Sequence, residues 1–230
     1  MSGGQLSVII PALNAARHLP QTFAPLVRGV AEGLLKEVII ADGGSTDQTL
    51  AMADAAGCYI VHSERGRAKQ LRAGAAEARG RWLLFLHADT VLASGWVEET
   101  QRFIAAPEAR KRAAAFRLAF DDRSRAARRV VFWARLRAQV MKLPYGDQGL
   151  LISRFLYDGL GGYTDMPLME DVDMVRRIGP KRLSLLETEA VTSADKYRRD
   201  GYDKRAWRNL SLMARYFMGA DPVELAKAYD

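Results

Sequence analysis

The first half of the chain alternates short apolar runs with longer segments in which apolar residues recur at helical spacing. The apolar runs are rich in leucine and β-branched residues, which favour strands, and they cover residues 6–10, 37–41, 58–62 and 81–86. The helical segments between them cover residues 19–34, 46–56 and 68–78. Strands that alternate with helices predict an α/β fold built on a mostly parallel, Rossmann-like sheet flanked by helices.

A capping pattern marks the start of the second predicted helix. Ser45 is followed three residues later by Gln48, the spacing at which two side chains can cap the first turn of a helix. The pattern predicts a helix that starts at Thr46. Asp42 would then lie in the turn between a strand and this helix.

The second half of the chain is more mixed. Helices are predicted over residues 94–105 and 124–142, and strands over 113–120 and 150–153. Glu170 and Asp171 are expected to open a further helix, because carboxylates suit the positive end of the helix dipole.

The C-terminal part, from residue 202 to 229, again has helical spacing. We therefore expect a main domain over residues 1–195 and a C-terminal helical extension over residues 196–230. The extension is expected to pack on the same domain.

The composition is that of a folded globular chain with an excess of basic residues. Apolar residues make up 49% of the 230 residues, and the formal net charge is +7. This charge fits phosphate-bearing substrates, an anionic membrane surface or nucleic acid. The basic helix over 124–142 could contact a membrane peripherally, or it could pack on the sheet with its basic face in solvent. Nucleic acid is not expected as a partner, because it would not explain the placement of the acidic residues.

The single cysteine, Cys58, allows neither an intramolecular disulfide nor a cysteine-based zinc site. The N-terminal apolar run is short and lacks the basic start of a secretory signal, and no apolar stretch is long enough to span a membrane. The expected location is the cytoplasm, with peripheral contact at the inner face of the membrane as a further expectation.

Acidic residues follow two of the predicted strands. Asp42 ends the second strand and Asp89 follows the fourth. Ligands of open α/β sheets bind at the carboxyl ends of parallel strands. Mg²⁺ and Mn²⁺ bind few protein carboxylates together with phosphate oxygens, so one aspartate can suffice. The pattern favours a site for a nucleotide and a divalent metal.

Five motifs, in order along the chain, resemble family 2 of the nucleotide-sugar glycosyltransferases, which have the GT-A fold. They are Pro11-Ala12-Leu13-Asn14, Asp42-Gly43-Gly44-Ser45-Thr46-Asp47, the segment 66–74, His87-Ala88-Asp89 and Glu170-Asp171. The segments 146–149 and 161–163 also resemble a subgroup, the arsenosugar-biosynthesis-type glycosyltransferases.

The resemblance implies an inverting transfer of a sugar from a nucleoside-diphosphate sugar, expected to be a UDP-sugar, to an acceptor hydroxyl. Asp171 would be the catalytic base, with Glu170 as the second catalytic candidate, and Asp89 would bind Mn²⁺ or Mg²⁺. The nucleotide would be bound by Pro11, Ala12, Asn14, Asp42, Arg67, Arg72, His87 and Ala88. The acceptor would be contacted by Asp147, Gln148 and Tyr163.

Three departures from the family pattern qualify this interpretation. Gly43 replaces the usual second acid after the second strand, and His87 replaces the first acid of the Asp-x-Asp motif. The Gln-x-x-Arg-Trp motif has no convincing copy. Several candidates also have a purely structural interpretation: Asp42 could close its turn, His87 could be a packed histidine, and Arg67 and Arg72 could be solvated.

Two other functions fit the same scaffold. The chain could be a non-catalytic nucleotide-sugar-binding protein, or a nucleotidyltransferase. A nucleotidyltransferase would be expected to carry a glycine-rich basic loop after the first strand, where this chain has Pro11 to Asn14. The acceptor is expected to be a small molecule or a lipid-linked molecule. A homodimer formed through the C-terminal helices is also an expectation.

Overall fold

The computed structural model of the chain describes residues 4–229. The strands are β1 (Leu6–Ala12), β2 (Leu35–Asp42), β3 (Tyr59–His62), β4 (Trp82–Phe85), β5 (Thr90–Leu92), β6 (Ala113–Phe120), β7 (Leu150–Ser153) and β8 (Leu183–Thr192). The helices are α1 (Leu19–Ala31), α2 (Thr49–Ala55), α3 (Arg67–Glu77), α4 (Trp96–Ala105), α5 (Arg125–Met141), α6 (Arg154–Gly159), α7 (Glu170–Ile178), α8 (Asp195–Asp200), α9 (Tyr202–Phe217) and α10 (Pro222–Lys227). Short 3-10 turns cover Ala109–Lys111 and Gly146–Gln148.

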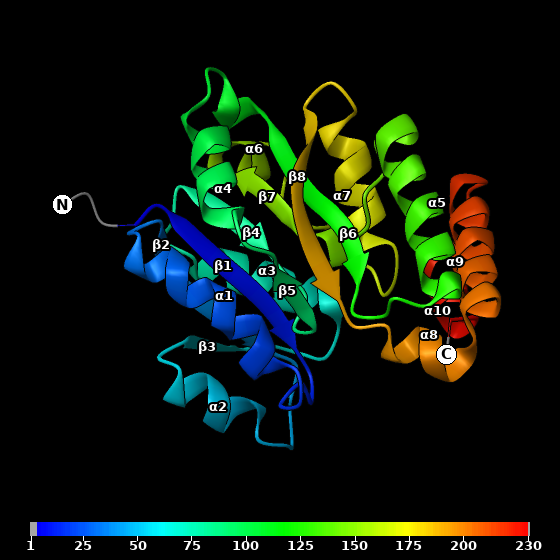
Figure 1. Cartoon of the computed structure of the whole chain (residues 1–230), viewed down its shortest axis with the longest axis horizontal. Coiled ribbons are helices and arrows are strands. Elements are labelled where there is room, and N and C mark those ends of the chain that lie inside the picture. The colour runs from blue at the N-terminus through cyan, green and yellow to red at the C-terminus, as the bar shows by residue number, and fades with distance from the viewer. Residues whose placement is uncertain (1–3, 230) are drawn as a thin grey trace.

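Within the described residues the strands form one sheet in the order β3-β2-β1-β4-β7-β6-β8-β5 (Figure 1). The first four strands of this order pair in parallel. β7 runs antiparallel to both β4 and β6, and β5 runs antiparallel to β8. The predicted α/β class is confirmed, with the parallel half of the sheet built from the N-terminal strands.

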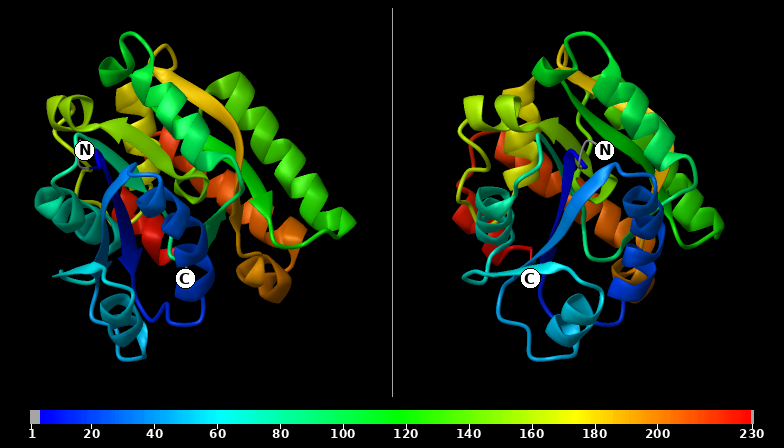
Figure 2. Two further views of the ribbon diagram at one scale, coloured as in Figure 1. Left: turned by 60° about the vertical axis from the view of Figure 1, so that its left-hand side comes forward. Right: turned by 90° about the vertical axis from the view of Figure 1, so that its left-hand side faces the viewer.

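Helices cover both faces of the twisted sheet (Figure 2). On one face, α1 and α4 pack over β1 and its neighbours, with Leu26 and Trp96 in the core. On the other face, α3, α6 and α7 bury Leu71, Tyr157 and Met174. Both faces of the central strands are apolar, which explains why these strands appear in the sequence as continuous apolar runs. Every helix within residues 4–229 is too short or too polar to cross a lipid bilayer.

One edge of the sheet collects the ends of most strands. β1, β2 and β4 run in the same direction, so their carboxyl ends lie together, with Ala12 beside Asp42. Because β7 is antiparallel to β4, the turn that precedes β7 lies at this edge as well. β6 and β8 also end there, at Phe120 and Thr192. This edge is where the topology places ligand chemistry.

The predicted helix start at Thr46 is wrong. Helix α2 begins at Thr49, and Gln48 precedes it without a side-chain cap. Asp47 accepts the Thr49 N–H instead, at 2.9 Å. The Ser45 hydroxyl accepts a hydrogen bond from the backbone N–H of Asn14 at 2.9 Å, so it joins two loops and caps no helix.

Candidate active site

A cavity of about 170 Å³ opens at the carboxyl edge of the sheet. Ionisable side chains from distant parts of the chain line it, among them Arg67 at the start of α3, His87 and Asp89 after β4, Asp147 before β7, and Asp171 on α7. The sequence places these residues far apart, and the sheet topology brings them together. Polar groups that converge in one cavity are the usual mark of a binding or catalytic site.

Asp171 lies in the first turn of α7 and is held by backbone donors. Its Oδ2 atom accepts the N–H of Gly146 at 2.7 Å, and its Oδ1 atom accepts the N–H of Val172 at 2.8 Å. A Cβ atom on Gly146 would lie 2.9 Å from His87 Nε2 and 3.1 Å from Asp171 Oδ2. Glycine at position 146 therefore lets the turn before β7 approach both side chains closely.

Glu170 lies next to Asp171 but is oriented away from the cavity. Its side chain is 1% exposed and forms an ion pair with Arg67 of α3. Burial raises the pKa of Glu170, and the Arg67 guanidinium opposes this shift. Of the two acidic residues predicted to be catalytic, only Asp171 lines the cavity. Glu170 holds Arg67 and joins the starts of α3 and α7.

Several cavity residues have displaced pKa values, among them His87 and Asp147. Burial, followed by the positive charge of Arg67, lowers the pKa of His87 to about 4, so its imidazole is neutral at pH 7. Burial raises the pKa of Asp147 to about 6, and the charges of Asp171 and Asp89 add to this shift while Arg137 opposes it. Groups with displaced pKa values are concentrated at functional sites.

The cavity has donor atoms that suit a divalent cation. Asp89 supplies carboxylate oxygens, and neutral His87 supplies an imidazole nitrogen, both of which Mn²⁺ accepts as ligands. The Oδ1 atom of Asp147 is buried and has no hydrogen-bond partner among the described residues. Within residues 4–229, no three His, Cys, Asp or Glu side chains are arranged as a complete cation site. The residues present therefore fit a cation whose remaining ligands come from the substrate.

The loops after β1 and β2 are tied to each other. Asp42 is 1% exposed, and its Oδ2 atom accepts the N–H of Gly44 at 2.9 Å and that of Ser45 at 3.1 Å. Asn14 has a left-handed backbone with φ 52°, and its Oδ1 atom accepts the N–H of Thr46 at 2.9 Å. Asp42 thus closes its own turn, and Asn14 holds that turn against the end of β1.

Gln70 explains why position 43 is a glycine. The buried Nε2 atom of Gln70 donates to Ala12 O at 2.7 Å and to Ala41 O at 2.9 Å. A Cβ atom on Gly43 would lie 3.0 Å from the Gln70 amide carbon. The space beside residue 43 is therefore occupied by Gln70, a residue that the sequence analysis did not single out.

Three further candidates lie outside the cavity. Arg72 is exposed and donates to the backbone oxygen of Tyr163 at 3.2 Å. Tyr163 is 3% exposed and packs on Phe85, and Gln148 is 1% exposed and donates to Phe116 O at 2.9 Å. The side chains of Gln148 and Tyr163 are thus held by the sheet and the core and do not line the cavity, and their contact with an acceptor stays a prediction. Of the three predicted acceptor contacts, only Asp147 lines the cavity.

The C-terminal helices supply cavity residues that the sequence analysis missed. Arg205 and Asn209 of α9 line the cavity together with Tyr229. Arg205 is 5% exposed and donates to Asp200 at 2.6 Å and to the Tyr229 hydroxyl at 2.8 Å. Arg205 and Asn209 are four residues apart and therefore share one helix face. A polar pair on the inward face of an amphipathic helix is the signal that could have revealed them.

Comparison with known proteins gives a consistent result. The sequence profile described as Glycosyl transferase family 2 matches residues 7–154. A PGL/p-HBAD biosynthesis glycosyltransferase of Mycobacterium bovis is 35% identical over 99 residues, which are 40% of this chain and 38% of that protein. Glucosyl-3-phosphoglycerate synthase of Mycobacterium tuberculosis is 35% identical over 95 residues, 40% of this chain and 28% of the relative. The chain thus aligns with less than half the length of these curated relatives.

Solved structures match over a larger part of the chain. The crystal structure of glucosyl-3-phosphoglycerate synthase from Mycobacterium tuberculosis with Mn²⁺, UDP and glucosyl-3-phosphoglycerate has a TM-score of 0.60. It is 19% identical, and the match covers 91% of this chain and 79% of that one. The same enzyme with Mn²⁺ and UDP-glucose has a TM-score of 0.60 at 20% identity, covering 83% of this chain and 71% of that one. These similarities show the GT-A fold, and the profile match over more than half of the sequence shows that the chain belongs to glycosyl transferase family 2.

Proposed function

We propose that the chain is an inverting glycosyltransferase that moves a sugar from a UDP-sugar to an acceptor hydroxyl with the help of a divalent metal. The observation that carries the proposal is the position of Asp171, held by two backbone N–H groups in a cavity at the carboxyl edge of the sheet. Membership of glycosyl transferase family 2 supports the reaction type. The solved neighbour that binds Mn²⁺ and UDP-glucose supports the choice of donor and metal.

In this proposal Asp171 is the catalytic base. It takes the proton of the acceptor hydroxyl while that oxygen attacks the anomeric carbon from the side opposite the nucleotide. The bond between the sugar and the diphosphate breaks, and UDP leaves with the electron pair. A carboxylate has about four lone-pair positions, so the bonds from Gly146 and Val172 orient Asp171 and still leave room for the acceptor proton.

Asp89 and the neutral imidazole of His87 are the residues that would hold the metal. When bound, a divalent cation offsets the negative charge of the leaving diphosphate. Arg67 and Lys196 also line the cavity, and they add positive charge for the same diphosphate.

The loops after β1 and β2 would bind the nucleotide. Their backbone is fixed by Asp42, Asn14 and Gln70, which gives the uridine a rigid surface at the end of β1, formed by Pro11 and Ala12. Arg72 and Ala88 remain proposed contacts at the edge of this surface. The cytoplasmic location, the dimer and the arsenosugar-type subgroup stay predictions.

The test combines donor binding with turnover. Thermal unfolding is followed with UDP-, GDP- and TDP-sugars, with and without Mn²⁺, and donor hydrolysis is measured in parallel. A metal-dependent rise in melting temperature for a UDP-sugar is expected, since a ligand at about 100 times its Kd stabilises the folded state by roughly 2.7 kcal/mol. Donor binding without any hydrolysis or transfer would favour the non-catalytic binding protein.

The substitution D171N tests the base. We expect kcat to fall by about 10²–10⁴-fold, the usual contribution of a general base, while the donor-induced shift persists. The matched control is D173N on the same helix, because Asp173 pairs with Arg177 and does not line the cavity. Hydrolysis by D171N at the rate of D173N would contradict the assignment.

A further inference from the structure

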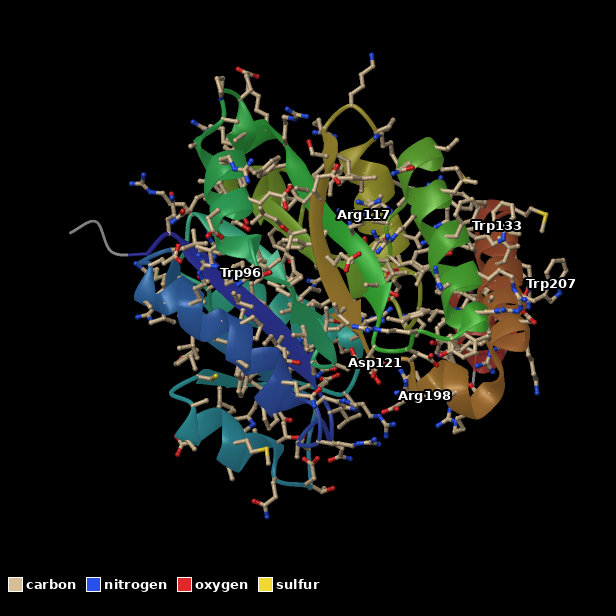
Figure 3. All side chains as sticks on the ribbon, viewed as in Figure 1. Trp96, Arg117, Asp121, Trp133, Arg198 and Trp207 are labelled. Carbon is tan, nitrogen blue, oxygen red and sulfur yellow. The ribbon has the colours of Figure 1, made fainter. Side chains whose placement is uncertain are left out.

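A groove of about 770 Å³ runs between α5 and α9, on the side of the molecule where Trp133 and Trp207 lie (Figure 3). Its walls are mainly apolar, with Val130 and Ala134 from α5 and Leu210 and Met213 from α9. This volume is within the range of pockets that enclose a drug-sized ligand.

The tryptophans at the groove are exposed to an unusual degree. Trp133 is 62% exposed and Trp207 is 73% exposed, and Leu210 beside them is 48% exposed. Indole rings have large apolar surfaces that are normally covered at least in part. Contiguous exposed apolar residues of this size mark binding surfaces.

The two helix walls are held at a fixed separation. Arg129 of α5 forms an ion pair with Asp203 of α9, with 2.7 Å between nitrogen and oxygen. Deeper in the groove, the Tyr145 hydroxyl donates to the Met213 sulfur at 3.0 Å. These two contacts tie α9 to α5 and to the turn before β7.

The groove borders the cavity that contains Asp171. Tyr145, Asp147, Tyr197 and Asn209 line both spaces. Gly146, between the first two of these residues, donates to the Asp171 carboxylate. A molecule lying in the groove thus has one end beside the candidate base.

Polar atoms without partners mark the junction of the two spaces. Within the described residues, Asp147 Oδ1 and Arg137 Nη2 are buried and form no hydrogen bond. Leaving such buried atoms unpaired destabilises the folded state, so they favour a ligand that pairs them. A hydroxyl group can donate to a carboxylate and accept from a guanidinium.

We propose that the groove between α5 and α9 binds the apolar portion of the acceptor, and that the acceptor is an amphiphile whose hydroxyl-bearing end lies at Asp147 and Asp171. The occupant is assigned from the four residues that line both the groove and the cavity, and from the unpaired polar atoms of Asp147 and Arg137 beside them. This inference rests on the proposed function for the transfer step. Binding of the apolar portion does not depend on that step.

Butyl, hexyl and octyl glucoside, kept below their micelle concentrations, are the probes for tail binding. Two of the four tryptophans lie at the groove, while Trp82 and Trp96 are buried, so changes in tryptophan emission report on the groove. We expect the Kd to fall by up to about fourfold for each added methylene. No dependence of Kd on chain length would overturn the inference.

Two variants locate the binding. A206F adds a ring inside the groove and should abolish the chain-length dependence. The control A214F adds the same ring to an exposed position of α9 that does not line the groove, and should leave the dependence unchanged. L210D, which places a charge in the groove, is a second variant and should also abolish it. Equal binding by A206F, L210D and A214F would overturn the inference.

Further measurements separate this inference from the proposed function. Chain-length-dependent binding without transfer of sugar would support the groove and contradict the proposed function. Transfer at equal kcat/KM to all three glucosides would support the proposed function and contradict the groove.

Two other occupants of the groove are tested separately. Sedimentation tests for a second copy of the chain: a dimer that A206F dissociates would show that another chain covers the groove. Binding to phosphatidylcholine vesicles that A206F abolishes, with no binding of the soluble glucosides, would show that the groove docks on a membrane. Either of these last two results would overturn the inference.

Discussion

Two sides of the carboxyl edge of the sheet differ in how completely their polar groups are paired. In the loops after β1 and β2 and in the adjoining helix α3, Asp42, Asn14 and Gln70 all have backbone partners. On the side formed by the turn before β7 and by α5, Asp147 Oδ1 and Arg137 Nη2 have none within residues 4–229. Buried polar atoms are normally paired, so unpaired ones indicate a place where a ligand completes the structure. The first side is complete by itself, and the second is arranged for a partner.

The largest expected effect is at the Arg67–Glu170 ion pair, which joins α3, on the first side, to α7, which contacts the turn before β7 on the second. R67A leaves the buried Glu170 carboxylate without its partner, and we expect a loss of about 3–5 kcal/mol in the free energy of unfolding. The loss should be smaller at pH 5 than at pH 8, because the stranded carboxyl can take up a proton. Urea unfolding at both pH values measures it.

The control for this prediction is R72A on the same helix. Arg72 is exposed and makes a single bond to Tyr163 O, so its removal should change the unfolding free energy by about 1 kcal/mol or less. If R67A and R72A are equally stable, the ion pair does not join the two sides.

A stabilising effect is expected at Asp147. Its pKa is raised to about 6 from the ordinary 3.8, so between these values the folded state binds more protons than the unfolded state. This difference in proton binding stabilises the folded state fully below pH 3.8, and the stabilisation is lost as the pH rises through 6. D147N cannot ionise and should be more stable than the wild type by up to about 3 kcal/mol at pH 7, with a difference that shrinks toward pH 4.

The pH dependence of the stability difference between D147N and the wild type distinguishes the effect of Asp147 from that of other titrating groups. The pKa of His87 is lowered to about 4, so the contribution of His87 to the stability of the folded protein decreases as the pH falls. This pH dependence is opposite to that of Asp147. Since His87 is present in both proteins, its contribution largely cancels in the comparison of denaturation midpoints. A D147N protein less stable than wild type at pH 7 would show that Asp147 is already paired, and the contrast between the two sides would fail.

The smallest effect is expected at Asn14. N14A removes the bond to Thr46 N–H and places a β-carbon at φ 52°, and we expect a loss of about 1–2 kcal/mol. N14D keeps both the acceptor and the tolerance for this backbone and should resemble the wild type. Thermal unfolding of the two variants decides whether Asn14 acts through its side-chain oxygen. Equal destabilisation of N14A and N14D would show that it does not.

The strands of the parallel half were predictable because their apolar runs are continuous, and β1 and β4 at the centre are buried on both faces. Their apolar runs overlap β1 to β4 to within two residues at each end, and the strand over Ala113–Phe120 matches β6 throughout. β8 was not predicted, since Glu187 and Glu189 interrupt its apolar pattern on the exposed side. β5 has three residues and depends on pairing with β8. The start of α2 was misplaced because the Ser45 hydroxyl binds a residue 31 positions away.

The site was predictable only where a motif lies at the end of a strand or helix. Asp89 and Asp171 line the cavity as such positions imply. Gln148 and Tyr163 could not be placed, because their burial depends on β6 and on Phe85 across the sheet. Arg205 enters the cavity through the packing of α9 against α5, a tertiary contact; the local pattern indicates an inward polar face on α9 but not the cavity that this face lines.

The contact between Gly43 and Gln70 has a consequence for how this sequence can change over evolutionary time. A side chain at position 43 would place its Cβ atom 3.0 Å from the Gln70 amide carbon, so the amide that donates to Ala12 O and Ala41 O would have to shift by a few tenths of an ångström. The two positions are therefore coupled, and we expect a relative that has the usual second acid at the position of Gly43 to have a shifted or smaller residue at the position of Gln70. Positions 43 and 70 would therefore change together during evolution, so the side chain presented to the nucleotide base would depend on both residues.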